Sequence, residues 1–267
     1  MKVFFISAIL CHAAVFCTAQ KTKSLVDTTL LQPVELSAVR ATDKTPVAKT
    51  DLSGNDIRKN NAGQDLPFIL NQTPSVIINS DAGNGIGYTG IRIRGIDASR
   101  VNVTINGIPY NDAESQGTYF VDLPDIASSV GSIQIQRGVG TSTNGAGSFG
   151  GTINLATNDI ITKSSLEFNN SGGSYHSFKN TLMFNSGILA KHFTIDGRMS
   201  NIRSDGYIER ASTRLRSFFL STAYIDTKNS LRLNIFSGKE KTYQAWNGID
   251  EETLKVNRRY NSAVKNF

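Results

Sequence analysis

Four short blocks decide the fold of this chain. They read IRGID at residues 93–97, VTINGIPY at 103–110, SIQIQRG at 132–138 and GGTINL at 150–155. Each joins a β-branched or alternating run to a glycine, asparagine or proline, which is typical of short strands separated by tight turns. Short helices are predicted beside them, at residues 65–70 and 123–130. We therefore expect a compact α+β domain over residues 46–158.

The residues from about 160 onward show a different pattern. Apolar and polar side chains alternate over five stretches, as in the run from Phe193 to Ser200, and turn signals such as Asp205-Gly206 and Lys228-Asn229 separate them. Alternation with period two predicts antiparallel strands, here of roughly 9–13 residues, the length of transmembrane barrel strands. In a soluble sheet the apolar face covers a core, whereas in a membrane barrel it faces lipid. Alternation alone leaves both explanations open.

The N-terminus has the features of a secretory signal. A short charged start precedes an apolar run that ends in small residues before Gln20, so we expect cleavage after Ala19. Both cysteines, Cys11 and Cys17, fall inside residues 1–19, and the mature chain therefore has no thiol for disulfides or catalysis. The whole chain has 28 Lys+Arg against 22 Asp+Glu, a surplus that is spread out rather than clustered.

Known catalytic and cofactor motifs find no support in this sequence. Residues 145–150 match G-x-G-x-x-G, but a strand-like run follows where a nucleotide-binding site needs a helix. His176 and His192 lack metal-ligand spacing, and no aromatic interleaving favours nucleic acid. We expect no enzyme, no cofactor, no bound metal and no nucleic-acid partner.

The four blocks together resemble, in order and spacing, the plug domain of TonB-dependent outer-membrane receptors. The resemblance implies a plug inside a 22-stranded barrel in the outer membrane of a Gram-negative bacterium, with membrane lipid around it. The residues matching the family's plug pattern are Arg94, Gly95, Asn106, Gly107, Arg137, Gly138, Gly150 and Gly151. The family often has Glu where Gln134 stands and Pro where Val139 stands, so a buried acid–arginine contact with the wall is expected to be altered.

The resemblance also implies a contact with TonB, the inner-membrane energy transducer. Residues 20–45 are expected to form a periplasmic arm, and its alternating stretch resembles a TonB box made of Val34, Glu35, Leu36, Ser37, Ala38 and Val39. An extended, mostly uncharged segment of this kind adds to a sheet edge through backbone hydrogen bonds. A plain linker is the alternative interpretation of this stretch.

Ligand contacts are expected on two plug loops that face outward, residues 81–88 and 110–120. The second loop offers Tyr110, Asn111, Gln116, Tyr119 and Phe120, aromatic and amide groups suited to a ferric chelate. We therefore expect uptake of a ferric siderophore or other iron chelate. Cobalamin or a glycan is the alternative ligand, and an exported β-rich binding or adhesion protein without transport is the alternative class.

Residues 159–267 provide only about five strands of the expected barrel. A full barrel of this kind needs upwards of roughly 400 residues, and five strands leave two sheet edges unpaired. We therefore expect residues 159–267 to be the first strands of a truncated barrel and the chain to be an N-terminal fragment.

Overall fold

A computed structural model describes residues 40–263, apart from residues 141–147, 158 and 244. The expected signal at residues 1–19 and the expected TonB box at residues 34–39 lie outside the described residues. The chain divides into two compact units, Met1–Leu31 and Gln32–Phe267, and every described residue belongs to the second. No helix in the described ranges has the length and apolar character needed to cross a membrane.

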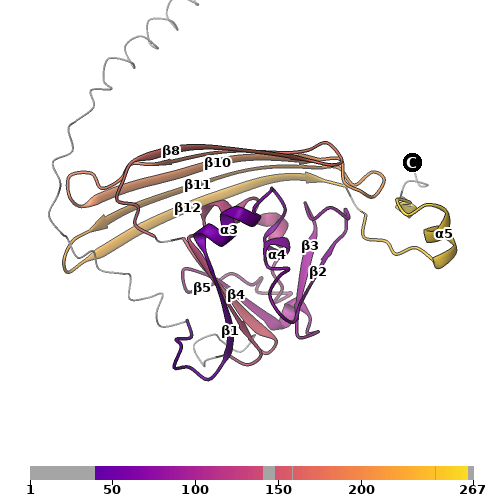
Figure 1. Ribbon diagram of the computed structural model, residues 1–267, viewed down its shortest axis with the longest axis horizontal. Helices are drawn as coiled ribbons and strands as arrows, with labels where there is room; N and C mark the ends of the chain where they lie inside the picture. Colours follow the sequence, from indigo (N-terminus) through magenta and orange to yellow (C-terminus); the bar gives the residue numbers. More distant parts are fainter. Residues whose placement is uncertain (1–39, 141–147, 158, 244, 264–267) are drawn as a thin grey trace, which may run out of the picture. The chain divides into compact units, whose positions relative to one another are not determined.

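The first part of the described chain forms a mixed five-stranded sheet (Figure 1). Its strands, in spatial order, are β1 (Ala48–Ser53), β6 (Ser132–Arg137), β7 (Gly151–Ala156), β4 (Val101–Ile105) and β5 (Ile108–Pro109). The β4–β7 pair is parallel and the other pairs are antiparallel. A separate hairpin pairs β2 (Val76–Ser80) with β3 (Thr89–Ile93). The α+β domain expected from the sequence is thus present.

Short helices cover the core of this domain. They are α3 (Gly54–Asn60), α4 (Leu66–Ile69) and the 3-10 turns η1 (Ala98–Arg100), η2 (Phe120–Asp122) and η3 (Ile126–Ser129). The helix predicted over residues 123–130 is wrong in its first half, because Asp125 has a left-handed backbone (φ 54°) and only η3 follows it. The core gathers isoleucines from the central strands, including Ile133, Ile135 and Ile153.

Two of the quoted blocks need their small residues for clear reasons. Asn106 and Gly107 have φ of 53° and 83° and connect β4 to β5 as a two-residue hairpin turn, which requires positive φ at both positions. Gly151 lies on β7 between β4 and β6, where a Cβ atom would come within 2.7 Å of the Gln136 carbonyl oxygen. The sheet therefore closes tightly only around glycine at this position.

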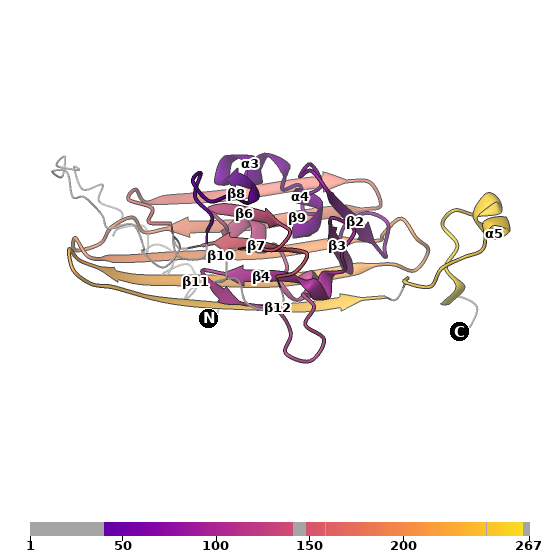
Figure 2. The ribbon, with the colours of Figure 1, turned by 90° about the horizontal axis from the view of Figure 1, so that it is seen from below.

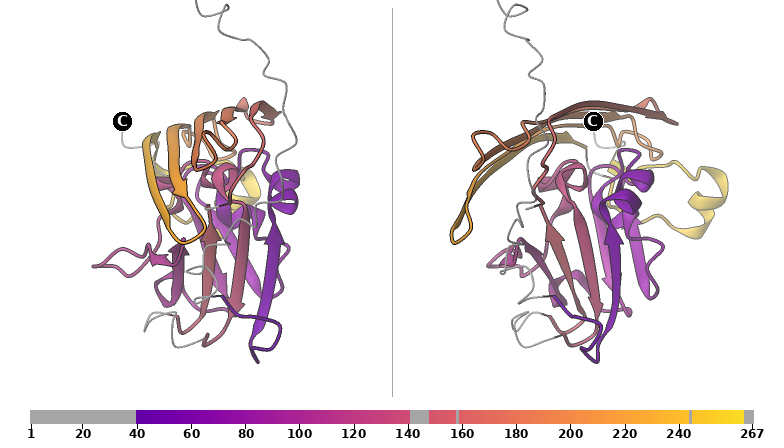
Figure 3. Two further views of the ribbon diagram at one scale, coloured as in Figure 1. Left: turned by 90° about the vertical axis from the view of Figure 1, so that its left-hand side faces the viewer. Right: turned by 60° about the vertical axis from the view of Figure 1, so that its left-hand side comes forward.

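The second part of the described chain is an antiparallel meander. Its strands are β8 (Ser165–Gly173), β9 (Ser177–Asn185), β10 (Phe193–Ser204), β11 (Thr213–Ile225) and β12 (Ser230–Thr242), and each pairs with the next. The strands lie side by side in Figure 2, and Figure 3 shows that this sheet is curved. The helix α5 (Glu251–Val256) follows. The five strands expected from alternation are confirmed, with lengths of 9 to 13 residues.

The two faces of the second sheet decide between the two explanations of its alternation. Leu166, Met199 and Leu231 on the apolar face are 73%, 64% and 72% exposed. The opposite face carries Thr181 and Arg198, which are 0% and 4% exposed. A soluble sandwich would bury the apolar face. Here the polar face is covered and the apolar face is open, which is the arrangement of a membrane wall.

Candidate functional site

One buried carboxylate connects the first sheet's domain to the polar face of the second sheet. Asp125 follows Pro124 in the plug, and its side chain is 1% exposed. Its Oδ1 accepts a hydrogen bond from Lys179 Nζ on β9 at 2.6 Å, and its Oδ2 accepts one from the Thr181 hydroxyl at 2.8 Å. Arg198 on β10 adds an ion pair at 3.3 Å. We call Asp125, Lys179, Thr181 and Arg198 the plug–wall cluster.

The electrostatics of the cluster favour an ionised Asp125. Burial raises the pKa of this carboxyl, but the Lys179 ammonium and the Arg198 guanidinium outweigh burial and hold the pKa below its ordinary value. One carboxylate therefore faces two cations whose side chains are 5% and 3% exposed. Removing the carboxylate would leave two buried positive charges without their counter-ion, which is costly in a low-dielectric environment.

Arg198 extends the cluster along the plug backbone. Its Nε donates to the Ser129 hydroxyl at 2.7 Å, and a terminal nitrogen donates to the Ser217 hydroxyl on β11 at 3.0 Å. The Ser217 hydroxyl in turn donates to the Pro124 carbonyl at 2.7 Å. Three neighbouring strands thus hold one short plug segment, so the cluster fixes the plug against the wall.

The plug arginines Arg94 and Arg137 make no ion pair with the strands that the structure describes. Arg94 has a left-handed backbone (φ 54°) and is exposed, with its guanidinium beside Gly138. Arg137 donates to the Pro74 carbonyl at 3.4 Å. Neither forms an ion pair with another described residue. The charged contact with the present strands runs the other way, from an acid in the plug to bases in the wall. In the sequence, the only indication of this contact is the position of Asp125 between the apolar residues Pro124 and Ile126.

The remaining plug-pattern residues lie at tight chain crossings. Gly138 donates its amide to the Gly150 carbonyl at 2.8 Å, and Gly150 donates to the Arg100 carbonyl at 2.7 Å. The Asn106 carboxamide oxygen accepts from the Thr157 amide at 2.8 Å. Gly95, with φ 76°, turns the chain after β3. These contacts connect the strand ends of the plug sheet to one another.

Gln134, where the family often has Glu, holds the segment that leads out of the arm. Its side-chain oxygen accepts from the Ala41 amide at 2.7 Å, and its Nε2 donates to the Ala41 carbonyl at 2.9 Å. Arg40 adds hydrogen bonds to the Ser132 and Asn154 carbonyls at 3.1 and 3.0 Å. An amide serves both backbone groups of Ala41 at once, whereas an ionised Glu has no hydrogen to donate.

The two loops expected to contact a ligand line one cavity of about 340 Å³. Asp81 and Tyr88 come from the first loop and Tyr119 from the second, and Tyr119 is 50% exposed. The Tyr88 ring also meets Trp246 edge to face at 6.2 Å between centroids. Partial burial raises the pKa of Asp81. The cavity therefore combines phenol rings with carboxylate and hydroxyl groups.

Among the other expected ligand residues, Gln116 is exposed outside this cavity, and the other three side chains make contacts within the domain. Asn111 uses its side chain to hold its own loop, accepting from the Val103 amide at 2.8 Å and donating to the Gln116 carbonyl at 2.8 Å. Tyr110 is partly buried against the core. Phe120 is 2% exposed and belongs to that core. Of the five side chains, only that of Tyr119 is both exposed and part of the cavity.

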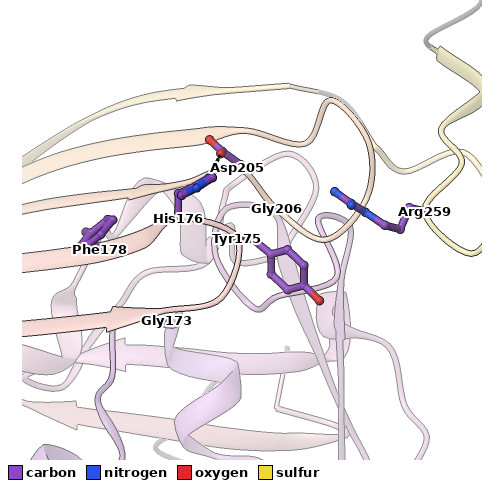
Figure 4. A pocket seen from close by; sticks show the side chains of 7 residues that line it. All are labelled: Gly173, Tyr175, His176, Phe178, Asp205, Gly206 and Arg259. Carbon is purple, nitrogen blue, oxygen red and sulfur yellow. Dashed lines mark hydrogen bonds and ion pairs between the residues drawn. The ribbon is translucent and has the colours of Figure 1, made fainter.

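A second cavity, of about 510 Å³, lies where the β8–β9 turn and the β10–β11 loop meet (Figure 4). His176 Nδ1 and Asp205 Oδ2 are 2.7 Å apart across the two turns. The Arg259 guanidinium lies 5.9 Å from the Tyr175 ring centroid. The first plug loop reaches the same end of the sheet, because the Asn84 amide donates to the Ser204 hydroxyl at 2.6 Å. Plug loop and strand loops thus share one end of the wall.

Comparison with known proteins defines the class. Residues 41–152 match the family model described as TonB-dependent Receptor Plug Domain. In this chain the matched plug domain is followed by antiparallel strands whose apolar face is exposed. Residues 41–152 therefore belong to the TonB-dependent receptor plug domain family. No curated protein matches the chain.

Solved structures share this fold at low sequence identity. The siderophore receptor PirA from Acinetobacter baumannii is 19% identical with a TM-score of 0.58, and the match covers 74% of this chain and 32% of PirA. The ferric citrate transporter FecA is 20% identical with a TM-score of 0.62, covering 81% and 34%. The copper transporter OprC is 16% identical with a TM-score of 0.62, covering 74% and 32%. The chain thus spans about a third of the receptors it matches.

Proposed function

We propose that this chain contributes the plug and first wall strands of a receptor that imports a scarce ligand with energy supplied through TonB. The plug–wall cluster carries the proposal. A closed importer needs a plug that is held firmly against the wall, but through polar contacts that water can replace when the plug moves. Asp125 with Lys179 and Arg198 is such a contact. Nothing of this kind is needed by a β-rich adhesion protein without transport.

TonB is the proposed source of the force. The segment Val34 to Val39 would add as a strand to TonB's sheet, and a pull on it would reach the plug through the next residues. Arg40 and Ala41 are bonded to β6 through Ser132 and Gln134. These bonds are the first to be loaded, so force enters the plug sheet at β6, an inner strand, rather than at the edge strand β1.

The proposed ligand is an iron chelate, a ferric siderophore first. Strand β8 starts where the plug ends, so in a receptor whose arm is periplasmic the β8–β9 turn and the β10–β11 loop face outward. The cavity of Asp81, Tyr88 and Tyr119 then opens outward. Its phenol and hydroxyl groups suit the oxygen-rich surface of such a chelate. By their names, PirA is a siderophore receptor, FecA a ferric citrate transporter and OprC a copper transporter.

Uptake by intact cells tests the proposal. Cells that have the full-length receptor and cells that lack it would be given radioactive iron as citrate, catecholate or hydroxamate complexes, and radioactive copper in parallel. We expect receptor-dependent accumulation of one iron complex and its loss in a Leu36→Pro variant, because proline removes a backbone donor needed for strand addition. Accumulation of copper alone would replace the iron assignment, and accumulation of none would refute both.

A further inference from the structure

The exposed face of the wall carries a group of basic side chains at one end. They are Arg203 on β10, Arg214 and Arg216 on β11, and Lys239 and Lys241 on β12, all exposed. They alternate with residues that face the plug domain or are buried, such as Ser204, Leu215 and Ser217. We call these five side chains the basic belt.

Strand register brings the belt together. Arg203 pairs with Arg214, and Arg214 pairs with Lys241, so these three form one row across three strands. Arg216 and Lys239 pair in the next row. Neighbouring strands lie about 4.8 Å apart and successive rows about 7 Å apart. Five positive charges therefore occupy an area of roughly 10 by 7 Å, comparable to a single lipid headgroup.

The belt borders the apolar band directly. One row further along the strands, Met199 and Phe218 are 64% and 42% exposed, and the exposed band continues to Phe193 and Leu231. From Met199 to Phe193 the band extends about 20 Å along β10. This approaches the apolar height of an outer-membrane barrel, about 25 Å. The belt thus lies at the level where lipid headgroups begin.

No carboxylate within the described residues forms an ion pair with any belt side chain. The other outward positions of the same two rows are Asn170, Gly172, Phe178, Asn180 and Asn201, which include no acid. By contrast, Lys179 and Arg198 on the plug-facing side share Asp125. Five like charges placed together repel one another, so the arrangement calls for an anionic partner.

We propose that the basic belt binds the phosphate groups of the glycolipid in the outer leaflet of the outer membrane. Guanidinium groups bind phosphate through paired hydrogen bonds, and ammonium groups add point charges. The apolar band beside the belt would contact the acyl chains of the same lipid. The choice of leaflet rests on the proposed orientation, in which the β10–β11 loop faces outward.

Lipid binding by the purified full-length receptor tests this. In detergent, native mass spectrometry would follow titration with bis-phosphorylated lipid A and with the same lipid after removal of its phosphates. At roughly fivefold per basic side chain for anionic lipid, we expect at least tenfold weaker binding after the five belt residues are changed to Gln. A variant with Arg203→Lys, Arg214→Lys and Arg216→Lys should bind within a fewfold of the unchanged receptor.

Matched controls separate a specific site from general charge. The control carries five Gln substitutions at exposed basic residues outside this sheet: Lys44, Lys59, Arg92, Arg100 and Lys255. It should bind lipid A as the unchanged receptor does, and circular dichroism melting should show that both variants fold. Equal loss in the control, or unchanged binding of the phosphate-free lipid, would overturn the proposal. Tighter binding of phosphatidylglycerol would overturn the leaflet assignment. Lipid binding and circular dichroism melting do not depend on ligand uptake, so a negative result for lipid binding leaves the transport proposal intact.

Discussion

Asp125→Asn is the sharpest perturbation of the contact between plug and wall. Asparagine tolerates the left-handed backbone of Asp125 (φ 54°), so the change removes charge without backbone strain. The ion pairs to Lys179 at 2.6 Å and to Arg198 at 3.3 Å are lost, and two buried cations remain. Breaking a buried pair from one side costs about 3–5 kcal/mol. The retained amide oxygen places the expected loss near the lower end, about 3 kcal/mol.

Urea unfolding of the plug within the purified full-length receptor measures this loss. With an m-value of about 2 kcal/mol per molar for a domain of this size, the midpoint should fall by roughly 1.5 M. Hydrogen exchange of plug peptides around residue 125 would report the transition. Asp122→Asn removes the same charge from an exposed position three residues away and should leave the midpoint unchanged.

The pH dependence provides a second check on the same residue. The pKa of Asp125 is lowered in the folded chain, so its contribution is present above its ordinary pKa of 3.8 and is lost only as pH falls through the still lower folded value. The difference between the unchanged receptor and Asp125→Asn should therefore stay constant from about pH 5 to pH 8. A midpoint shift equal to that of Asp122→Asn would refute the assigned role of the cluster.

Three further predictions concern the plug. Burial raises the pKa of Asp65 to about 8, so the folded chain holds a proton that the unfolded chain releases near pH 4. Stability should therefore fall as pH rises between these two values. The Asp65→Asn variant should show a smaller fall of the urea midpoint over this pH range, and an unchanged fall would refute this assignment. Gly151→Ala should destabilise the plug by about 1–3 kcal/mol, since its Cβ would meet a carbonyl oxygen at 2.7 Å, whereas Gly172→Ala, with its nearest neighbour at 3.7 Å, should be silent in the same titration. Phe120→Ala should cost about 3–5 kcal/mol of stability. Tyr119→Ala should leave stability intact and weaken binding of the imported chelate roughly tenfold in a titration. The reverse pattern would exclude the cavity lined by Asp81, Tyr88 and Tyr119 as the ligand site.

Local patterns were sufficient to predict the strands. Alternation along β10 and β11 is a property of neighbouring residues, and it gave the number and length of the wall strands. The Asn106–Gly107 turn was likewise visible, because positive φ at two adjacent positions strongly selects these residues. What alternation could not decide was which face is covered. The covered face is the polar one, because Arg198 on that face donates hydrogen bonds to Ser129 and Pro124 of the plug.

The contacts of the candidate site depended on partners far apart in sequence. Asp125 meets Lys179 across 54 positions, and no local pattern indicates that pairing. Tyr119 and Phe120 are neighbours of similar chemistry, yet η2 turns one ring outward and the other into the core. The helix expected over residues 123–130 is reduced to the short turn η3, because the left-handed backbone of Asp125 prevents its first half from forming.

Uptake before and after collapse of the inner-membrane proton gradient tests the central claim most directly. Cells with the full-length receptor would be incubated with the radioactive iron complex they accumulate, and surface-bound and internalised iron would be separated by washing with excess unlabelled complex. We predict that an uncoupler abolishes internalisation and leaves surface binding unchanged. The Leu36→Pro variant should show the same two effects without an uncoupler. Continued internalisation in uncoupled cells would contradict the assignment of this plug to a TonB-driven importer.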